Sequence, residues 1–450
     1  MTGAHVSTRT KQVCTILVLA VPALVFYLIL FRTAVNLPIL DDYEIILGAA
    51  NSLHQTHGLA SHAAIVFTSE HNGYKLMFEN SIIWLFYSLI GRIYIFPLVA
   101  IGNALAVLIF LAIAFMARDN AEDISSWLVM LVPAAFLVFQ LQYASALNFA
   151  SSSLQHLAVV AFSLFAIYFL SRNAQSSFVF SCIASILAIG SSPNGFFLAP
   201  VGLLMLIQKK QWKRLAYWIA LFSLMLALYL LRYASPVTPG GGSGAALHNL
   251  NVIYALSFLG ASVARYSSVL PSVVLGLIFC GVIGFATVRR YFLQNPAVFY
   301  SMIFILINAI AVSGLRSDSG VAQSLASRYR TYSNLMLVFS YFFFAENAVR
   351  LWRTQRGRRV AFAAVMVVSI LFCAISDMAG ARFLNEKKLA LRQSYRTEWQ
   401  KSQGGAGLTN AEIEADPILR RQMEAGVYKV NLPILQESVR LGVYEPPLHP

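Results

Sequence analysis

Asp41 and Asp42 are adjacent carboxylates that follow the first long apolar stretch of the chain, Val13 to Phe31. A charged pair beside a bilayer is energetically costly and usually has a function. A carboxylate next to a second carboxylate holds its proton more tightly, and a nearby cation has the opposite effect. Such a pair can take a proton from a hydroxyl group, bind a divalent cation, or do both. The alternative is structural, because Asp42 could cap a helix that begins at Tyr43.

Three further polar residues, Glu70, His71 and Lys75, precede the apolar segment 76–90. We assign them to a substrate-binding set with the acidic pair. The alternative is that the first two cap a helix and that the lysine reaches towards lipid headgroups. Asn194 lies in a Pro-Asn-Gly turn, which is ordinary turn chemistry unless its side chain faces the same cavity.

A basic cluster occurs late in the chain, where Arg316, Arg328 and Arg330 fall within one polar segment with Tyr329. Guanidinium groups match the geometry of phosphate oxygens, and a tyrosine could line the adjacent groove. Any one of these arginines could instead contact a lipid headgroup or pair with Asp318. Three together, opposite an acidic loop, favour phosphate recognition.

The composition places these residues in a membrane protein. Hydrophobic residues make up 58% of the 450 residues, charged residues only 12%, and the mean hydropathy is +0.66. A soluble chain carries about twice that charged fraction. The net charge of +14 could suggest a nucleic-acid partner, but the basic residues gather in short connections, as cytoplasmic loops do. We therefore predict membrane lipids as partners and no nucleic acid.

The apolar stretches predict about eleven transmembrane helices, each near the length of about 20 residues that crosses a bilayer. They are residues 13–31, 93–117, 125–143, 148–170, 177–191, 195–207, 214–232, 269–288, 297–314, 332–346 and 360–377. A short basic start without a cleavage site puts the N-terminus in the cytoplasm. An odd number of spans then puts the C-terminus outside.

The expected fold is all-α, with a transmembrane domain over residues 1–377 and an extracytoplasmic polar helical tail over 378–450. The outer loop 32–92 carries the acidic motif, and its aromatic segment 76–90 is expected to lie as a helix on the membrane surface. The outer loop 315–331 carries the basic motif. The Pro- and Gly-rich residues 234–250 predict a flexible outer loop.

The chain resembles GT-C-type glycosyltransferases, a class that uses polyprenyl-phosphate-linked sugars on the extracytoplasmic side of the membrane. More narrowly, it is similar to bacterial multi-span proteins with Asp-Asp, Glu-His-Arg and Ser-Arg-Tyr motifs. The matching residues are Asp41-Asp42-Tyr43, Glu70-His71, Asn194-Gly195-Phe196 and Ser327-Arg328-Tyr329. Asn72 stands where the second motif usually has arginine.

The resemblance implies a hexosyl- or pentosyltransferase of the bacterial inner membrane. It would move a sugar from a polyprenyl-phosphate donor to an envelope glycan or lipid acceptor, with inversion at the sugar carbon. Asp41 or Asp42 would activate the acceptor hydroxyl, while Arg328 and Arg330, supported by Arg316, would hold the donor phosphate. No cofactor is certain, and participation of a divalent cation stays open. The alternative is a polysaccharide polymerase or a lipid-linked oligosaccharide flippase.

Overall fold

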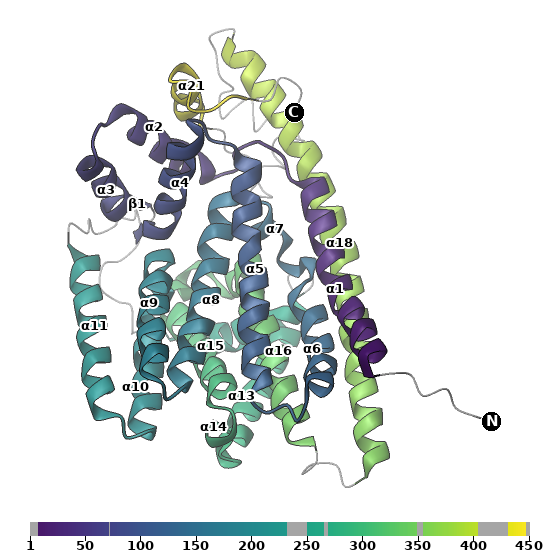
Figure 1. Ribbon diagram of the computed structural model, residues 1–450. Helices are drawn as coiled ribbons and strands as arrows, with labels where there is room; N and C mark the ends of the chain where they lie inside the picture. The colour runs from purple at the N-terminus through teal and green to yellow at the C-terminus, as the bar shows by residue number, and fades with distance from the viewer. Residues whose placement is uncertain are drawn as a thin grey trace.

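The computed structural model describes residues 8–71, 73–231, 250–264, 269–348, 354–403 and 431–446. The expected flexible loop at 234–250 lies outside the described residues except for its last residue, and Asn72 also lies outside them. The described chain is almost entirely helical (Figure 1), with a single two-stranded sheet among the described residues. The all-α prediction is therefore confirmed.

The elements have the following bounds. The helices are α1 (Thr8–Thr33), α2 (Gly48–Gln55), α3 (Leu59–Thr68), α4 (Met77–Ile90), α5 (Ile95–Arg118), α6 (Ile124–Val138), α7 (Ala144–Leu147), α8 (Ala150–Ser171), α9 (Gln175–Ser191), α10 (Leu198–Gln208), α11 (Trp212–Leu230), α12 (Val252–Leu259), α13 (Leu270–Val288), α14 (Tyr291–Gln294), α15 (Pro296–Arg316), α16 (Ser327–Glu346), α18 (Gln355–Gln403) and α21 (Leu432–Arg440). The single-turn segments are η1 (Tyr43–Leu47), η2 (Leu141–Tyr143), η3 (Pro193–Phe197), η4 (Ala261–Val263), η5 (Ser317–Ser319) and η6 (Val321–Leu325), and the strands are β1 (Glu70–His71) and β2 (Tyr74–Lys75).

Eight helices among the described residues are long and apolar enough to cross a membrane. They are α1, α5, α6 with its continuation to Leu147, α8, α11, α13, α15 and α18. The other three expected spans also coincide with helices, namely α9, α10 and α16, but these are shorter or more polar. The structure thus supports a polytopic membrane protein, while the count of eleven spans and the GT-C-like arrangement stay predictions.

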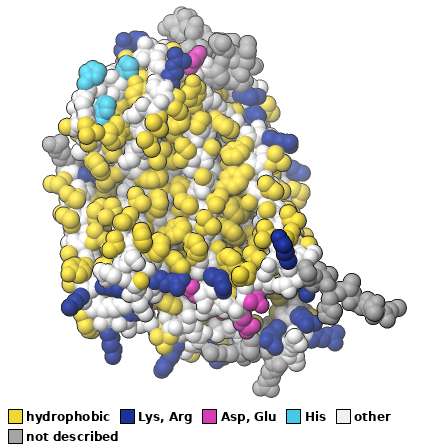
Figure 2. Space-filling model, in the orientation of Figure 1, with side chains coloured by type: hydrophobic (Ala, Val, Ile, Leu, Met, Phe, Trp, Pro, Cys, Tyr) yellow, Lys and Arg dark blue, Asp and Glu magenta, His cyan; other side chains and the backbone are white. Residues whose placement is uncertain are grey.

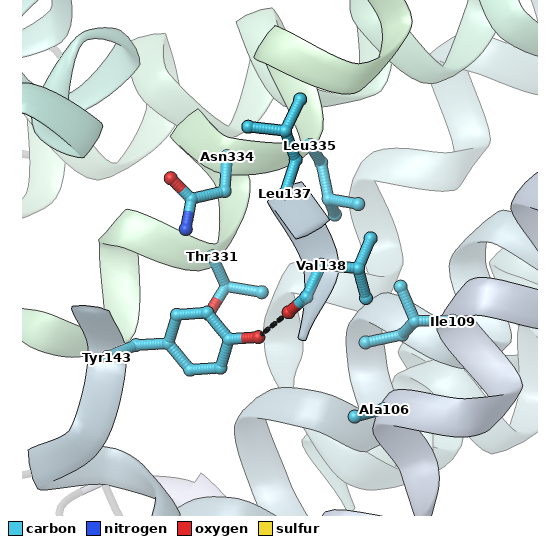
Figure 3. A pocket seen from close by; sticks show the side chains of 8 residues that line it. All are labelled: Ala106, Ile109, Leu137, Val138, Tyr143, Thr331, Asn334 and Leu335. Carbon is cyan, nitrogen blue, oxygen red and sulfur yellow. Dashed lines mark hydrogen bonds between the residues drawn. The ribbon is translucent and has the colours of Figure 1, made fainter. Parts of the chain in front are cut away.

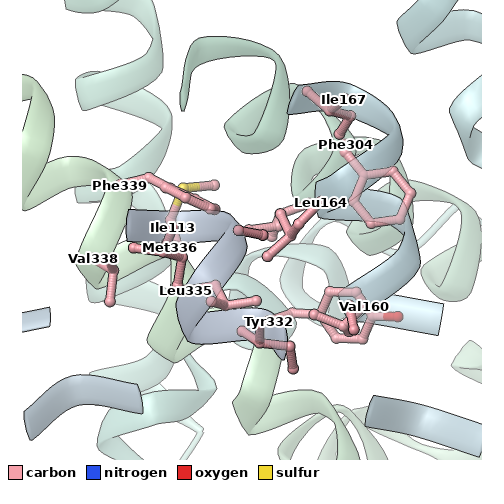
Figure 4. Packing of buried hydrophobic residues seen from close by; sticks show 14 of the residues in the cluster. Ile113, Val160, Leu164, Ile167, Phe304, Tyr332, Leu335, Met336, Val338 and Phe339 are labelled. Carbon is pink, nitrogen blue, oxygen red and sulfur yellow. The ribbon is translucent and has the colours of Figure 1, made fainter. Parts of the chain in front are cut away.

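The core lies between helices that are apolar on most of their faces, as buried helices are. Ile113, Leu164, Phe304, Met336 and Phe339 come from α5, α8, α15 and α16 and meet at its centre (Figure 4). Helices α5 and α8 also approach closely at Gly102, where an added Cβ would collide with Ser153. Small residues at such contacts are typical of helix packing in membranes.

One end of the bundle, at the top of Figure 1, carries η1, α2, α3, the β1–β2 hairpin, α4 and α21. We call it the acidic-loop end. The segment after α21 closes this end, because Ile93 pairs with Tyr444 and the backbone N–H of Ile93 donates to Val443 O at 2.7 Å. The Tyr444 hydroxyl also donates to the carbonyl of Asn36 at 2.8 Å. Residues far apart in the sequence therefore hold the first long loop together.

The domain boundary expected after residue 377 does not coincide with a structural break. Helix α18 runs for 49 residues, about 70 Å, and continues through that position to Gln403. Near the acidic-loop end the Lys387 ammonium donates to Asn148 Oδ1 at 3.3 Å, and that of Lys388 donates to Arg32 O at 2.7 Å. The change in composition at 378 marks a change of environment, but charged residues such as lysine and glutamate continue a helix well.

Candidate functional site

Asp42 points into the protein and is fully buried. Its Oδ1 accepts a hydrogen bond from the Ser151 backbone N–H at 2.8 Å, and its Oδ2 accepts one from the Ile39 N–H at 3.1 Å. Burial raises the pKa of Asp42 to about 6, although these backbone donors favour the charged form. Ser151 is in the first turn of α8, so Asp42 caps this distant helix. It makes no capping hydrogen bond to the helical turn that begins at Tyr43, so the alternative that Asp42 caps that turn does not hold.

Asp41 faces the opposite way, and its side chain is 50% exposed. It lies 3.6 Å from Nε2 of His71, while Nδ1 of the same imidazole lies 3.1 Å from Glu44 Oε2. We call Asp41, Glu44 and His71 the carboxylate–histidine cluster. The hydrogen bond to Asp41 raises the pKa of His71 most strongly, and the negative charges of both carboxylates add to this effect. The adjacent aspartates therefore differ in role, since only Asp41 can reach a bound molecule.

The raised pKa of His71 predicts a pH-dependent loop. A histidine with a folded-state pKa above its unfolded value of about 6.5 stabilises the fold fully below that pH. This contribution is lost as the pH rises through the folded-state pKa. We expect amide hydrogen exchange in residues 41–75 to speed up, relative to the bundle helices, as the pH rises above about 6.5, and H71Q to flatten this change. Identical pH dependence in wild type and H71Q would contradict the prediction.

The β1–β2 hairpin places His71 next to the basic residues. Its strands are antiparallel, with Glu70 opposite Lys75 and His71 opposite Tyr74. Gly73 has φ of +75°, a conformation that favours glycine. The Asn-Gly pair between two short strands is a strong hairpin signal that the motif comparison overlooked.

Arg316 contacts this hairpin, and Arg328 lies at the start of α16, which packs against the helix that ends in Arg316. Arg316, at the end of α15, donates from Nη2 to the Tyr74 hydroxyl, and its guanidinium carbon lies 5.7 Å from the centroid of the Tyr74 ring. Arg328 begins α16 and lies 5.1 Å from the Tyr329 ring. Both guanidinium charges act on His156 of α8. No carboxylate in the described part of the chain forms an ion pair with either arginine.

This arrangement has the charge and the donors that suit an anion. Both arginines are half-buried, and a partly buried positive charge is stable only when it is paired or hydrogen-bonded. Guanidinium groups that lie close together repel each other, and an anion between them offsets this repulsion. A phosphate group fits, because its oxygens can accept several N–H donors at once.

Arg330 and Lys75 use their donors within the fold. Arg330 donates from Nε to Leu325 O and from Nη1 to Gln142 O, both at 3.1 Å. Lys75 is only 1% exposed, and its ammonium donates to Leu231 O at 2.5 Å. These contacts brace α16 and join the hairpin to the end of α11. We therefore leave both residues out of the anion site.

Asn194, Tyr329 and Glu70 border the site without binding each other. The amide of Asn194 donates to the hydroxyl of Tyr332 at 3.3 Å, which ties η3 to the helix that carries Arg328. Tyr329 is buried against Phe258, with ring centroids 4.8 Å apart. Glu70 is half-buried, and its Oε1 has no hydrogen-bond partner among the described residues.

The structure offers no ready metal centre in its described residues, since no three His, Cys, Asp or Glu side chains are grouped to hold an ion. A small cavity of about 10 Å³ lies between α5, α6, η2 and α16 (Figure 3). Its lining is Ala106, Ile109, Leu137, Val138, Tyr143, Thr331, Asn334 and Leu335. It has room for about one water molecule and contains none of the charged site residues.

Comparison of the chain with protein-family models, curated proteins and solved structures finds no match.

Proposed function

We propose that this chain is a membrane glycosyltransferase that moves a sugar from a polyprenyl-phosphate donor to a hydroxyl group of an envelope glycan or lipid. The observation that carries the proposal is the pair of arginines, Arg316 and Arg328, which lack a carboxylate partner in the described chain. Arg316 contacts Tyr74 in one strand of the hairpin, and His71 in the other strand lies 3.6 Å from the exposed Asp41. An anion site and a proton acceptor are the two groups that displacement at a sugar phosphate requires.

In this proposal, Arg316 and Arg328 bind the donor phosphate, and Asp41 hydrogen-bonds the acceptor hydroxyl. The acceptor oxygen forms a bond to the anomeric carbon as the bond from that carbon to the phosphate oxygen breaks. The hydroxyl proton passes to Asp41, and the phosphate leaves with its charge held by the two guanidinium groups. Direct displacement inverts the anomeric centre. His71 keeps the Asp41 carboxylate oriented.

The same proposal places the acidic-loop end outside the cytoplasm of a bacterial inner membrane. Figure 2 shows Lys and Arg side chains along the lower rim of a broad hydrophobic band. Basic residues at the ends of helices or in the turns there include Arg118, Arg172, Lys209, Arg214 and Arg289. Basic residues concentrate on the cytoplasmic side of membrane proteins. The lipid tail of the donor would then lie in the outer leaflet.

Lipid mass spectrometry of a deletion strain tests this function. We expect the deletion to accumulate a polyprenyl-phosphate hexose or pentose, because its consuming enzyme is absent. Re-expression of the wild-type chain should clear this lipid, and D41N should not. A deletion that leaves such lipids unchanged but accumulates lipid-linked oligosaccharides would instead indicate the polymerase or flippase.

A further inference from the structure

We propose that Tyr74 is a positioning residue that holds Arg316 ready for the anion, and that the β1–β2 hairpin couples this arginine to the carboxylate–histidine cluster. The inference rests on the anion-binding part of the proposed function. It is independent of whether a sugar is transferred.

The contact with Tyr74 fixes the Arg316 side chain while leaving it able to bind. Arginine has five N–H donors, and the Tyr74 hydroxyl accepts one of them from Nη2. The ring also lies 5.7 Å from the guanidinium carbon, within the range of a cation–π interaction. Arginine carries much rotamer freedom, and restricting it before binding reduces the entropy lost when the anion arrives. Most donors of Arg316 therefore stay available to a phosphate.

Tyr74 is itself held from both sides. It lies opposite His71 in the hairpin, and His71 contacts the two carboxylates of the cluster. The next residue, Lys75, is also held in place. Its backbone N–H donates to the Tyr229 hydroxyl at 3.1 Å, and its ammonium donates to Leu231 O. The hairpin is therefore joined to the end of α11 through one strand and to the carboxylate–histidine cluster through the other. A displacement of one strand should move the other strand as well.

The connection through the hairpin predicts that the His71 contacts and anion binding at Arg316 strengthen each other. Loss of the His71 contacts should let the hairpin move, and Tyr74 should then hold Arg316 less well. Because binding free energies are reciprocal, an anion at Arg316 should in turn tighten the His71 contacts. A merely structural Tyr74 would affect the stability of the fold without changing anion affinity selectively.

The experiment measures binding of farnesyl phosphate, a short lipid phosphate, to the full-length protein in detergent. We expect Y74F, which keeps the ring and loses the hydroxyl, to weaken binding by about threefold to tenfold, as expected when one long side chain must be ordered on binding. Its melting temperature should match that of Y87F. Tyr87 is a suitable control because its hydroxyl bonds His54 at 2.7 Å, at the same end but away from Arg316.

Combined variants separate the inference from the proposed function. Y74F added to R316Q should cause no further loss, because Tyr74 acts through Arg316. H71Q should weaken binding in the same direction as Y74F. If R316Q weakens binding and Y74F does not, only the inference fails. If R316Q binds as well as wild type, the anion site fails and the inference fails with it. A sugar-transfer assay without activity, combined with the expected binding losses, would overturn the proposed reaction alone.

Discussion

Asp41→Asn is expected to reduce sugar transfer at least a hundredfold while lowering the melting temperature of the protein only slightly. A positioned general base contributes about 10²–10⁴-fold to a reaction rate, and an amide cannot accept the proton. The Asp41 side chain is half-exposed, so the substitution removes little packing. Transfer from radiolabelled lipid-linked donor in proteoliposomes, together with a thermal unfolding scan, measures both effects.

Asp42→Asn provides the matched control and should behave in the opposite way. An asparagine side chain has a single acceptor oxygen, but two backbone N–H groups, those of Ile39 and Ser151, donate to Asp42. One buried donor loses its partner, which costs about 1–3 kcal/mol of stability. Transfer per folded molecule should fall less than in D41N. If D42N loses more transfer per folded molecule than D41N, the roles assigned to the two aspartates are reversed.

Removing both anion-site charges is the second substitution with a large expected effect. R316Q combined with R328Q should weaken binding of farnesyl phosphate by about a hundredfold or more, because each charge-assisted hydrogen bond is worth about 1.5–3 kcal/mol. The loss should shrink at high ionic strength, where the wild-type attraction is screened. Titration at two salt concentrations, with uncharged farnesol as the reference ligand, isolates the phosphate contribution.

Arg330→Gln distinguishes a specific site from a general loss of positive charge. The substitution removes one positive charge only two residues from Arg328. In the wild type, the Arg330 guanidinium donates to the carbonyls of Leu325 and Gln142. We expect this variant to unfold at a lower temperature and to retain most of its affinity for farnesyl phosphate. Equal losses of affinity in R330Q and R328Q would argue against a defined anion site.

The helices were predictable because length and hydropathy are local properties of the chain. Each of the eleven expected spans coincides with a helix, including the boundaries of α8 and α13 to within about two residues. Helix α12 was not predicted, because its apolar stretch is too short to cross a bilayer. The last predicted span ended at 377, since hydropathy reports the surroundings of a helix and not its hydrogen bonding.

The site was only partly predictable. Helical spacing already indicates that Arg328 and Arg330 point to different faces, because residues two apart are not neighbours on a helix. The sequence analysis treated them as a unit, and the structure separates them. No sequence rule could assign the roles of Asp41 and Asp42, since the partners of Asp42 come from Ile39 and from Ser151 on a later helix. That the acidic and basic segments are joined through the hairpin follows only from tertiary structure.

The contact between Tyr444 and Asn36 has a consequence for how this molecule matures. The two residues are separated by 408 positions, so translation needs about 20–80 s to produce the second after the first. During that interval the outer loop 32–92 has already been synthesised but lacks its contacts with the segment after α21. The first long loop should therefore reach its final structure only after Tyr444 has been synthesised.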